Sequence, residues 1–390
     1  MISENGTEIL ILDGGLGTTL EDVFHKNIST PLWSAKPIDD DPETIIEAHL
    51  AFLRAGADVI LTSTYQCAWE TFERSGYSRT DAVRIMRKSV ALAVEARRRY
   101  LLDERNDGNK DTPQKHIRIA LALGPYGAAL PHAQEFSGFY PPPYGPKGYT
   151  PNEKNCNAFG DLDAGARSKK AAIEALTTFH LERLRVFAED KDTWDAIDFV
   201  AFETVPLARE ITAIRRAVGV LLGQVGALQM KRWWIATVYP GGHFPGELSP
   251  GGGKLTVQEV TTSAFRKNGD AALLPRPIGF GVNCTSIEFL PTLLQEATDT
   301  IQTVCNDEDY RPLLVVYPNR GDVFDGVNHT WHPSDTQTQG GAWAKYLCDI
   351  VRPVMERNIW GGLIVGGCCK TGPEEIAALV RQVKSRDETN

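Results

Sequence analysis

Residues 278–284 read IGFGVNC and residues 363–369 read LIVGGCC, and each stretch is a run of mostly apolar residues that ends in cysteine. Neither stretch alternates between apolar and polar side chains, and both contain β-branched residues. Continuous runs of this kind are typical of strands that are buried on both faces of a parallel sheet. The two stretches therefore predict parallel strands whose carboxyl ends carry Cys284, Cys368 and Cys369.

Six further apolar runs and eight helical patterns accompany these two strands. The other predicted strands cover residues 9–14, 58–64, 117–124, 197–203, 233–240 and 313–318. Apolar residues at helical spacing predict helices over residues 42–55, 80–102, 164–188, 206–222, 256–267, 286–298, 343–355 and 373–383. Eight βα units favour an α/β fold with one closed (β/α)8 TIM barrel, which we expect to form a single domain over residues 1–390. A doubly wound open sheet is the alternative, although the glycines of residues 14–17 are too close together for a dinucleotide-binding motif.

The composition of the chain argues against several classes of protein. Of its 390 residues, 42% are hydrophobic and 23% are charged, which is close to the average of globular proteins. The net charge of −9 argues against nucleic acid or an anionic membrane as the main partner. Seven scattered cysteines are poor evidence for a secreted disulfide framework, and no signal peptide or spanning segment is visible. We therefore expect a cytoplasmic protein that acts on small molecules and needs no protein partner.

Two long insertions follow predicted strands. Residues 131–157 are rich in Pro, Gly and Tyr, and residues 241–253 read GGHFPGELSPGGG. In a TIM barrel, the loops that follow strands lie on the C-terminal face, where active sites are found. We therefore expect both insertions to border the active site on that face. A polar insert at residues 103–114 follows a helix instead, and we expect it to be a solvated loop on the opposite face.

The cysteines at the strand ends could bind one metal ion. Cys284, Cys368 and Cys369 could supply three thiolates to zinc and leave a fourth position open for a substrate. Because adjacent residues on a regular strand face opposite ways, the last two can share a metal only if the backbone leaves extended geometry. Gly366 and Gly367 allow such a departure. Two other interpretations remain open, namely small buried hydrophobic residues and a vicinal disulfide between Cys368 and Cys369.

Six short motifs occur in order along nearly the whole chain. They are LDGGLGT at residues 12–18, GADVILTSTYQ at 56–66, GPYGA at 124–128, FET at 202–204, GVNCT at 281–285 and GGCC at 366–369. Together they resemble the homocysteine S-methyltransferases, the zinc-dependent family that includes the betaine-using and S-methylmethionine-using enzymes. The combination of the last two motifs is the most specific part of this resemblance.

The resemblance implies a zinc-dependent methyl transfer. Cys284, Cys368 and Cys369 would hold one zinc ion per chain, with the homocysteine sulfur as fourth ligand. A free thiol has a pKa near ~8.5, so metal coordination is what makes it a thiolate at neutral pH. This thiolate would attack the methyl group of a sulfonium donor and form methionine. In the resembled family, the positions of Asp13 and Glu203 hold the ammonium group of homocysteine, as charge-assisted hydrogen bonds would allow.

Further residues are predicted to line the substrate site. Gly14 and Gly15 open a turn whose backbone N–H groups could bind the homocysteine carboxylate. Asn283 could shape the wall beside the metal. Thr64 and Tyr65 end the second motif on the same face and are also expected to contact substrate.

The methyl donor would be cationic at its reacting centre, and aromatic faces attract such cations. Aromatic residues on the predicted C-terminal face are Tyr65, Tyr126, Phe136, Phe139, Tyr140 and Tyr144. A loop with one Glu and a Tyr-rich stretch resembles the S-methylmethionine branch, which assigns Glu135 and Tyr140 to donor binding. Residues 131–134 read PHAQ where that branch has Ala-Asp-Gly-Ser, so S-adenosylmethionine remains an alternative donor. Betaine is less favoured, because the long C-terminal arm of the betaine branch is not expected here.

Two alternatives from other classes remain. A cysteine-rich zinc or redox sensor without methyl transfer would use the same three cysteines. A metal-free barrel enzyme would use His243, His329 or His332 for acid–base chemistry.

Overall fold

Eight parallel strands form one closed sheet in the computed structural model, which describes residues 8–106, 115–267, 274–305, 310–325, 330–332 and 340–384. The strands are β1 (Glu8–Ile11), β2 (Val59–Leu61), β3 (Arg118–Leu123), β4 (Phe199–Val205), β5 (Arg232–Thr237), β6 (Gly279–Ser286), β7 (Leu313–Asn319) and β10 (Gly362–Val365). They pair in the order β1-β10-β7-β6-β5-β4-β3-β2. A parallel bridge between Leu12 and Val59 joins the two ends of that order. The sheet is therefore a barrel, and the open doubly wound alternative is wrong.

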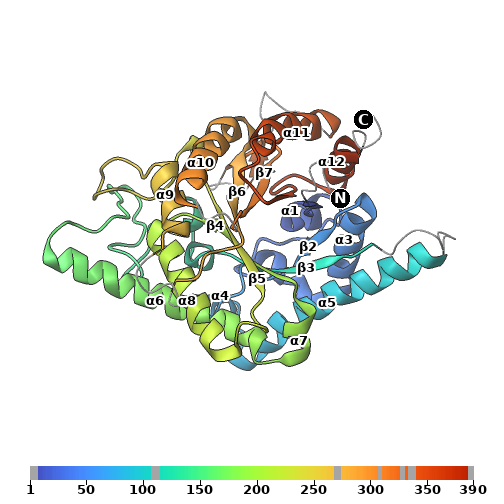
Figure 1. The fold of residues 1–390 in the computed structure, drawn as a ribbon. Helices are drawn as coiled ribbons and strands as arrows, with labels where there is room; N and C mark the ends of the chain where they lie inside the picture. Colours follow the sequence, from blue (N-terminus) through green and yellow to red (C-terminus); the bar gives the residue numbers. More distant parts are fainter. Residues whose placement is uncertain are drawn as a thin grey trace.

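Helices surround the barrel (Figure 1). The long ones are α3 (Pro42–Ala55), α5 (Arg79–Asn106), α6 (Asp163–Ala188), α8 (Ala208–Val225), α9 (Val257–Phe265), α10 (Leu290–Val304), α11 (Gly341–Glu356) and α12 (Pro373–Lys384). Shorter elements are α1 (Leu16–Asp22), α2 (Pro37–Asp40), α4 (Trp69–Arg74), α7 (Lys191–Ala196), η1 (Trp33–Ala35), η2 (Tyr126–Ala129), η3 (Gln134–Phe136), η4 (Pro240–Gly242), η5 (Ile287–Phe289), β8 (Val323–Asp325) and β9 (Thr330–His332). The predicted (β/α)8 architecture is confirmed. Within the described ranges, no helix combines the length and the apolar character that crossing a membrane requires.

The strands separate two apolar layers. On β4, Phe199 and Ala201 pack inside the barrel, whereas Val200 and Phe202 pack outward against the helices. Because both layers are buried, the first four positions of β4 are all apolar, which explains the continuous apolar runs of the sequence. Glu203 is the next inward position after Ala201, so its carboxylate belongs to the mouth of the barrel.

The polar insert at residues 103–114, predicted to be a loop, begins as helix in the structure. Helix α5 continues to Asn106, so residues 103–106 are helical and not part of a loop. These four residues carry no apolar side chain, and hydrophobic spacing therefore cannot detect them. An ion pair of 3.3 Å between Arg54 and Asp103 connects this helix end to α3. Residues 107–114 lie outside the described residues.

The two insertions after β3 and β5 are tied to each other by Asn157. Its Nδ2 atom donates to Ser137 O at 2.7 Å and to Pro245 O at 2.9 Å. Its Oδ1 atom accepts from Glu247 N at 2.9 Å. Both insertions follow strands, and these bonds join them into one packed unit on the C-terminal face.

Candidate active site

Three cysteine side chains meet at the carboxyl ends of β6 and β10. The Sγ atoms of Cys284, Cys368 and Cys369 all lie within 4.8 Å of one another. Three sulfurs bound to one zinc ion at about 2.3 Å would lie about 3.8 Å apart in tetrahedral geometry. The cluster therefore has the donor set and the spacing that a thiolate-bound metal needs.

The backbone beside these cysteines leaves extended geometry. Cys284 has a φ of 46° and Lys370 has a φ of 62°. Thr371 N donates to Cys368 O over a distance of 3.1 Å, which closes a tight turn at the two cysteines. This turn brings the Sγ atoms of Cys368 and Cys369 to 4.0 Å. The vicinal disulfide is therefore wrong. Cys368 is instead bonded to Cys284, with their Cα atoms 5.5 Å apart, and reduction of that bond frees both thiolates for a metal.

Two buried carboxyl groups face the mouth of the barrel. Asp13 is 0% exposed and Glu203 is 6% exposed. Asp13 Oδ2 accepts from Leu61 N at 2.8 Å, but Asp13 Oδ1 and Glu203 Oε1 have no hydrogen-bond partner among the described residues. Burial raises the pKa of Asp13 well above its usual range, and the charge of Glu203 raises it further. Burial also raises the pKa of Glu203 to about 8. Unsatisfied carboxylates in such a place fit a cationic ligand.

Gly14 and Gly15 allow the turn that carries Cys368 and Cys369 to pack against the end of β1. A Cβ atom on Gly14 would lie 2.2 Å from Thr371 O, and one on Gly15 would lie 2.4 Å from Cys368 O. The N–H group of Gly15 donates to Thr371 O at 2.9 Å. This N–H is therefore not free for a substrate carboxylate, which corrects the expectation from sequence. That Gly14 contacts substrate stays a prediction.

Glu135 and Tyr65 interact electrostatically with Cys369. Glu135 is 7% exposed, and its Oε2 atom has no hydrogen-bond partner among the described residues. Burial raises its pKa to about 7. Burial, and then the charge of Glu135, raise the pKa of the Cys369 thiol to about 12. Burial together with the charges of Glu135, Glu203 and Cys369 raises the pKa of Tyr65 well above its ordinary value. The predicted donor-side and metal-side residues are thus neighbours.

Asn283 and Thr64 use their polar atoms inside the protein. Asn283 Oδ1 accepts from Thr204 N at 2.8 Å, and Asn283 Nδ2 donates to Thr204 Oγ1 at 2.8 Å. Thr64 Oγ1 donates to Ala122 O at 2.7 Å. These contacts hold strand ends in place, and direct contact of either residue with substrate stays a prediction.

Tyr140 lies behind the site, in an aromatic cluster with Tyr126 and Tyr144. Its side chain is fully buried, and its hydroxyl donates to Glu210 Oε2 at 2.7 Å. The rings of Tyr126 and Tyr144 stack with centroids 3.8 Å apart. The Tyr140 hydroxyl is thus already bound, which favours a role in holding the insertion over the predicted contact with the donor.

Three residues with buried polar atoms inside the barrel or at strand ends were given no role in the sequence analysis. Tyr317 and Trp234 belong to the inner layer of the barrel, and the Tyr317 hydroxyl and Trp234 Nε1 have no hydrogen-bond partner among the described residues. The Tyr317 hydroxyl still lies close enough to Glu203 to lower its pKa slightly. Because alternate residues of a strand face the same side, the inward position of Val315 could have indicated that Tyr317, two residues later, also points into the barrel. The third residue is Thr204, which ends the FET motif but was given no role in the sequence analysis.

The histidines of the metal-free alternative gain no support from the structure. His243 is exposed in the insertion that follows β5. His329 lies outside the described residues, and for His332 only the strand position is described.

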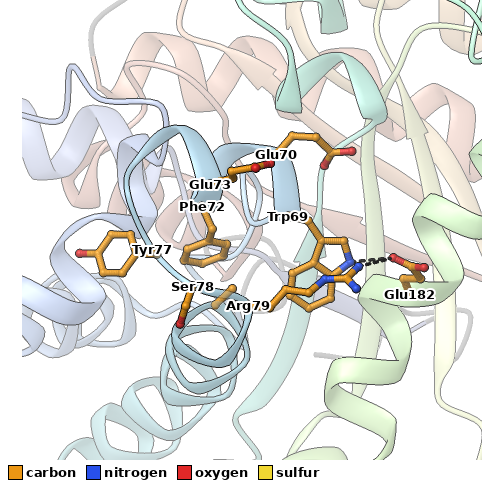
Figure 2. A pocket seen from close by; sticks show the side chains of 9 residues that line it. Trp69, Glu70, Phe72, Glu73, Tyr77, Ser78, Arg79 and Glu182 are labelled. Atoms are coloured by element: carbon orange, nitrogen blue, oxygen red, sulfur yellow. Dashed lines mark hydrogen bonds and ion pairs between the residues drawn. The ribbon is translucent and has the colours of Figure 1, made fainter.

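A surface pocket of about 550 Å³ lies apart from the cysteine cluster. Figure 2 shows Trp69, Arg79 and Glu182 on its wall. Trp69 Nε1 donates to Glu182 Oε2 at 2.8 Å, and the Arg79 guanidinium lies 4.6 Å from the centre of the Trp69 ring. None of the predicted site residues line this pocket.

Known proteins resemble this chain over nearly its whole length. The sequence profile described as homocysteine S-methyltransferase matches residues 10–383. Homocysteine S-methyltransferase 1 from Brassica oleracea var. italica is 30% identical over 378 residues, which cover 96% of this chain and 94% of that protein. Homocysteine S-methyltransferase YbgG from Bacillus subtilis (strain 168) is 30% identical over 380 residues, which cover 97% of this chain and 96% of that protein.

A solved structure agrees with these matches. The homocysteine methyltransferase MmuM from Escherichia coli, in its metallated form, is 28% identical, with a TM-score of 0.60 and 97% of each chain covered. The alternative of a zinc or redox sensor without methyl transfer is therefore wrong. The chain belongs to the homocysteine S-methyltransferase family and is an enzyme that transfers a methyl group to homocysteine.

Proposed function

We propose that the chain transfers a methyl group from a sulfonium donor, preferably S-methylmethionine, to homocysteine at a zinc ion held by Cys284, Cys368 and Cys369. The observation that carries this proposal is the meeting of three cysteine sulfurs within 4.8 Å at the barrel mouth. All-sulfur ligand sets select zinc over the harder cations that prefer oxygen.

Asp13 and Glu203 would bind the ammonium group of homocysteine. Each offers a buried carboxylate oxygen with no hydrogen-bond partner among the described residues. An ammonium group between the two would satisfy both oxygens and favour their charged forms, whose formation burial otherwise opposes. Gly367 N donates to Asp13 O at 3.1 Å, so the strand end that carries Asp13 adjoins the one that carries the cysteine pair, which supports this arrangement.

The donor would lie on the side of Glu135 and Tyr65. A sulfonium carries a full positive charge, and the unpartnered carboxylate oxygen of Glu135 would offset it in a water-poor site. The Tyr65 ring offers an aromatic face to the same cation. The preference for S-methylmethionine over S-adenosylmethionine or betaine rests on the resemblance of the loop that carries Glu135.

The reaction balances without a general base in the transfer step. The homocysteine sulfur forms a bond to the methyl carbon while the S–CH3 bond of the donor breaks. The electron pair of the broken bond stays on the donor sulfur, which leaves as a neutral thioether. Zinc bound by the three cysteines would lower the pKa of the homocysteine thiol, so its proton goes to solvent before the transfer.

A donor panel tests this proposal. Reduced, zinc-loaded protein is incubated with homocysteine and one methyl-labelled donor at a time, namely S-methylmethionine, S-adenosylmethionine or betaine. Mass spectrometry then measures labelled methionine. We expect the highest kcat/KM with S-methylmethionine. Faster transfer from betaine would overturn the sulfonium assignment, and no transfer from any donor would overturn the proposed reaction.

A further inference from the structure

Two residues at the barrel mouth have left-handed backbone although neither is glycine. Thr204 has a φ of 58° and Cys284 has a φ of 46°. The register of the β4–β5 pair shifts between Phe202 and Val205, and the register of the β6–β7 pair shifts around Cys284. A β-branched residue such as Thr is strained in this conformation, which persists only where surrounding contacts enforce it.

Asn283 connects the two strained positions. Its Oδ1 atom accepts from Thr204 N, and its Nδ2 atom donates to Thr204 Oγ1, each at 2.8 Å. Both side chains are fully buried. Strands β4 and β6 are not neighbours in the sheet, so this pair of bonds spans β5 at the mouth of the barrel. We call the reciprocal Asn283–Thr204 pair the brace.

Each end of the brace adjoins a side chain of the site. Glu203 directly precedes Thr204, and Cys284 directly follows Asn283. Successive side chains of a strand point to opposite sides, so a change of backbone direction at these positions decides where the next functional atom lies. The brace therefore sets the direction of the Glu203 carboxylate and of the Cys284 sulfur together.

We propose that Asn283 and Thr204 are positioning residues that couple the metal-binding half of the site to its ammonium-binding half. This inference rests on the proposed function. Without the brace, both strand ends can relax from their strained conformations, and zinc affinity and homocysteine affinity then fall together. On the donor side, Glu135 belongs to a different insertion, whereas the Tyr65 hydroxyl interacts with the side chain of Thr204.

Thr204→Val tests the brace, because it keeps the β-branched shape and the backbone N–H but removes the hydroxyl. Thr204→Ser restores the hydroxyl. Thr261→Val is the matched control, since Thr261 in α9 is also fully buried but its hydroxyl has no partner among the described residues. Chelator competition measures the zinc dissociation constant of the reduced apoprotein, calorimetry on zinc-loaded protein measures the homocysteine dissociation constant, and kinetics measure the donor KM.

Loss of one buried hydrogen bond predicts a rise of about 10-fold in both dissociation constants for Thr204→Val. Thr204→Ser and Thr261→Val stay within about two-fold of wild type in both dissociation constants and in the donor KM. A rise in only one dissociation constant, or equal behaviour of the two valine variants, overturns the coupling. If Thr204→Val does not fold, Thr204→Ala takes its place. A wild-type protein that binds zinc but forms no methionine contradicts the proposed function, while the two binding measurements still test the brace.

Discussion

Glu203 illustrates how a single residue can connect substrate binding to pH. Burial raises its pKa to about 8, so the ligand-free protein holds this group mostly as a neutral acid at pH 7. A bound ammonium group favours the carboxylate, and homocysteine binding therefore releases a proton. The ligand-free protein should lose stability as pH rises toward about 8, because the native state keeps a proton that the unfolded chain has already released.

The homocysteine KM should therefore fall as the pH rises from about 6.5 to about 8.5. In Glu203→Gln the KM should be raised at least about 10-fold at the upper pH, because a charge-assisted hydrogen bond is lost. In this variant, homocysteine binding should release about one proton fewer, since the amide does not titrate, and the KM should therefore depend less on pH. Steady-state kinetics across this range measure both effects. Parallel pH profiles for the two proteins would contradict the assignment of Glu203.

The close packing of Gly15 against the turn at Cys368 gives a second prediction for a single residue. A methyl group there would lie 2.4 Å from Cys368 O and 2.7 Å from Thr18 Oγ1. Gly15→Ala should push the turn that carries Cys368 and Cys369 away, destabilise the protein by about 1–3 kcal/mol and weaken the proposed zinc binding. Gly160→Ala is the control, because its added Cβ meets no heavy atom within 4 Å. Thermal melts and zinc titrations compare the two, and equal zinc affinity would show that the close approach does not matter.

Among the elements, α6 and α8 hold the insertion that carries Glu135. Glu210 Oε1 in α8 accepts from Tyr126 N at 2.7 Å and lies 3.0 Å from His180 Nε2, and Glu210 Oε2 accepts from the Tyr140 hydroxyl at 2.7 Å. Gly127, which follows Tyr126, packs closely against the insertion, because a Cβ atom added to it would lie 2.4 Å from the backbone N of Glu135. Buried contacts thus lead from α8 through η2 to the proposed donor side.

Glu210→Gln should weaken this support selectively. An amide cannot accept at both positions, so the Tyr140 hydroxyl must turn to accept from the amide, and the charge-assisted hydrogen bonds of Glu210 are replaced by weaker neutral ones. We expect a donor KM raised about 10-fold, with homocysteine KM and zinc content unchanged within about two-fold. Glu174→Gln, an exposed position on α6, serves as the control. Equal rises in both KM values would point instead to general destabilisation.

For the whole molecule, the sequence predicted most of the architecture, because the eight strands are buried on both faces. Their continuous apolar runs and the helical spacing between them survive in the structure almost unchanged. The short helices α1, α2, α4 and α7 were not predicted, since each has seven residues or fewer and no apolar repeat long enough to detect. The exposed end of α5 was missed for a related reason.

The site was less predictable than the fold. Motifs identified the three cysteines and the two carboxylates, and the structure brings the cysteines together. Hydrogen bonding could not be foreseen, because it depends on contacts distant in sequence. Asn283 is held by Thr204, the Gly15 N–H is used by Thr371, and the Tyr140 hydroxyl is used by Glu210.

Zinc content and methyl transfer, measured together on the reduced protein, test the central claim most directly. Wild-type protein should contain one zinc ion per chain and form labelled methionine, lose both after chelation, and regain both when zinc is returned. Cys284→Ala, compared with a Cys156→Ala control outside the cluster, should retain no zinc and form no product. Full methionine formation by zinc-free protein, or by Cys284→Ala, would contradict the proposed metal site.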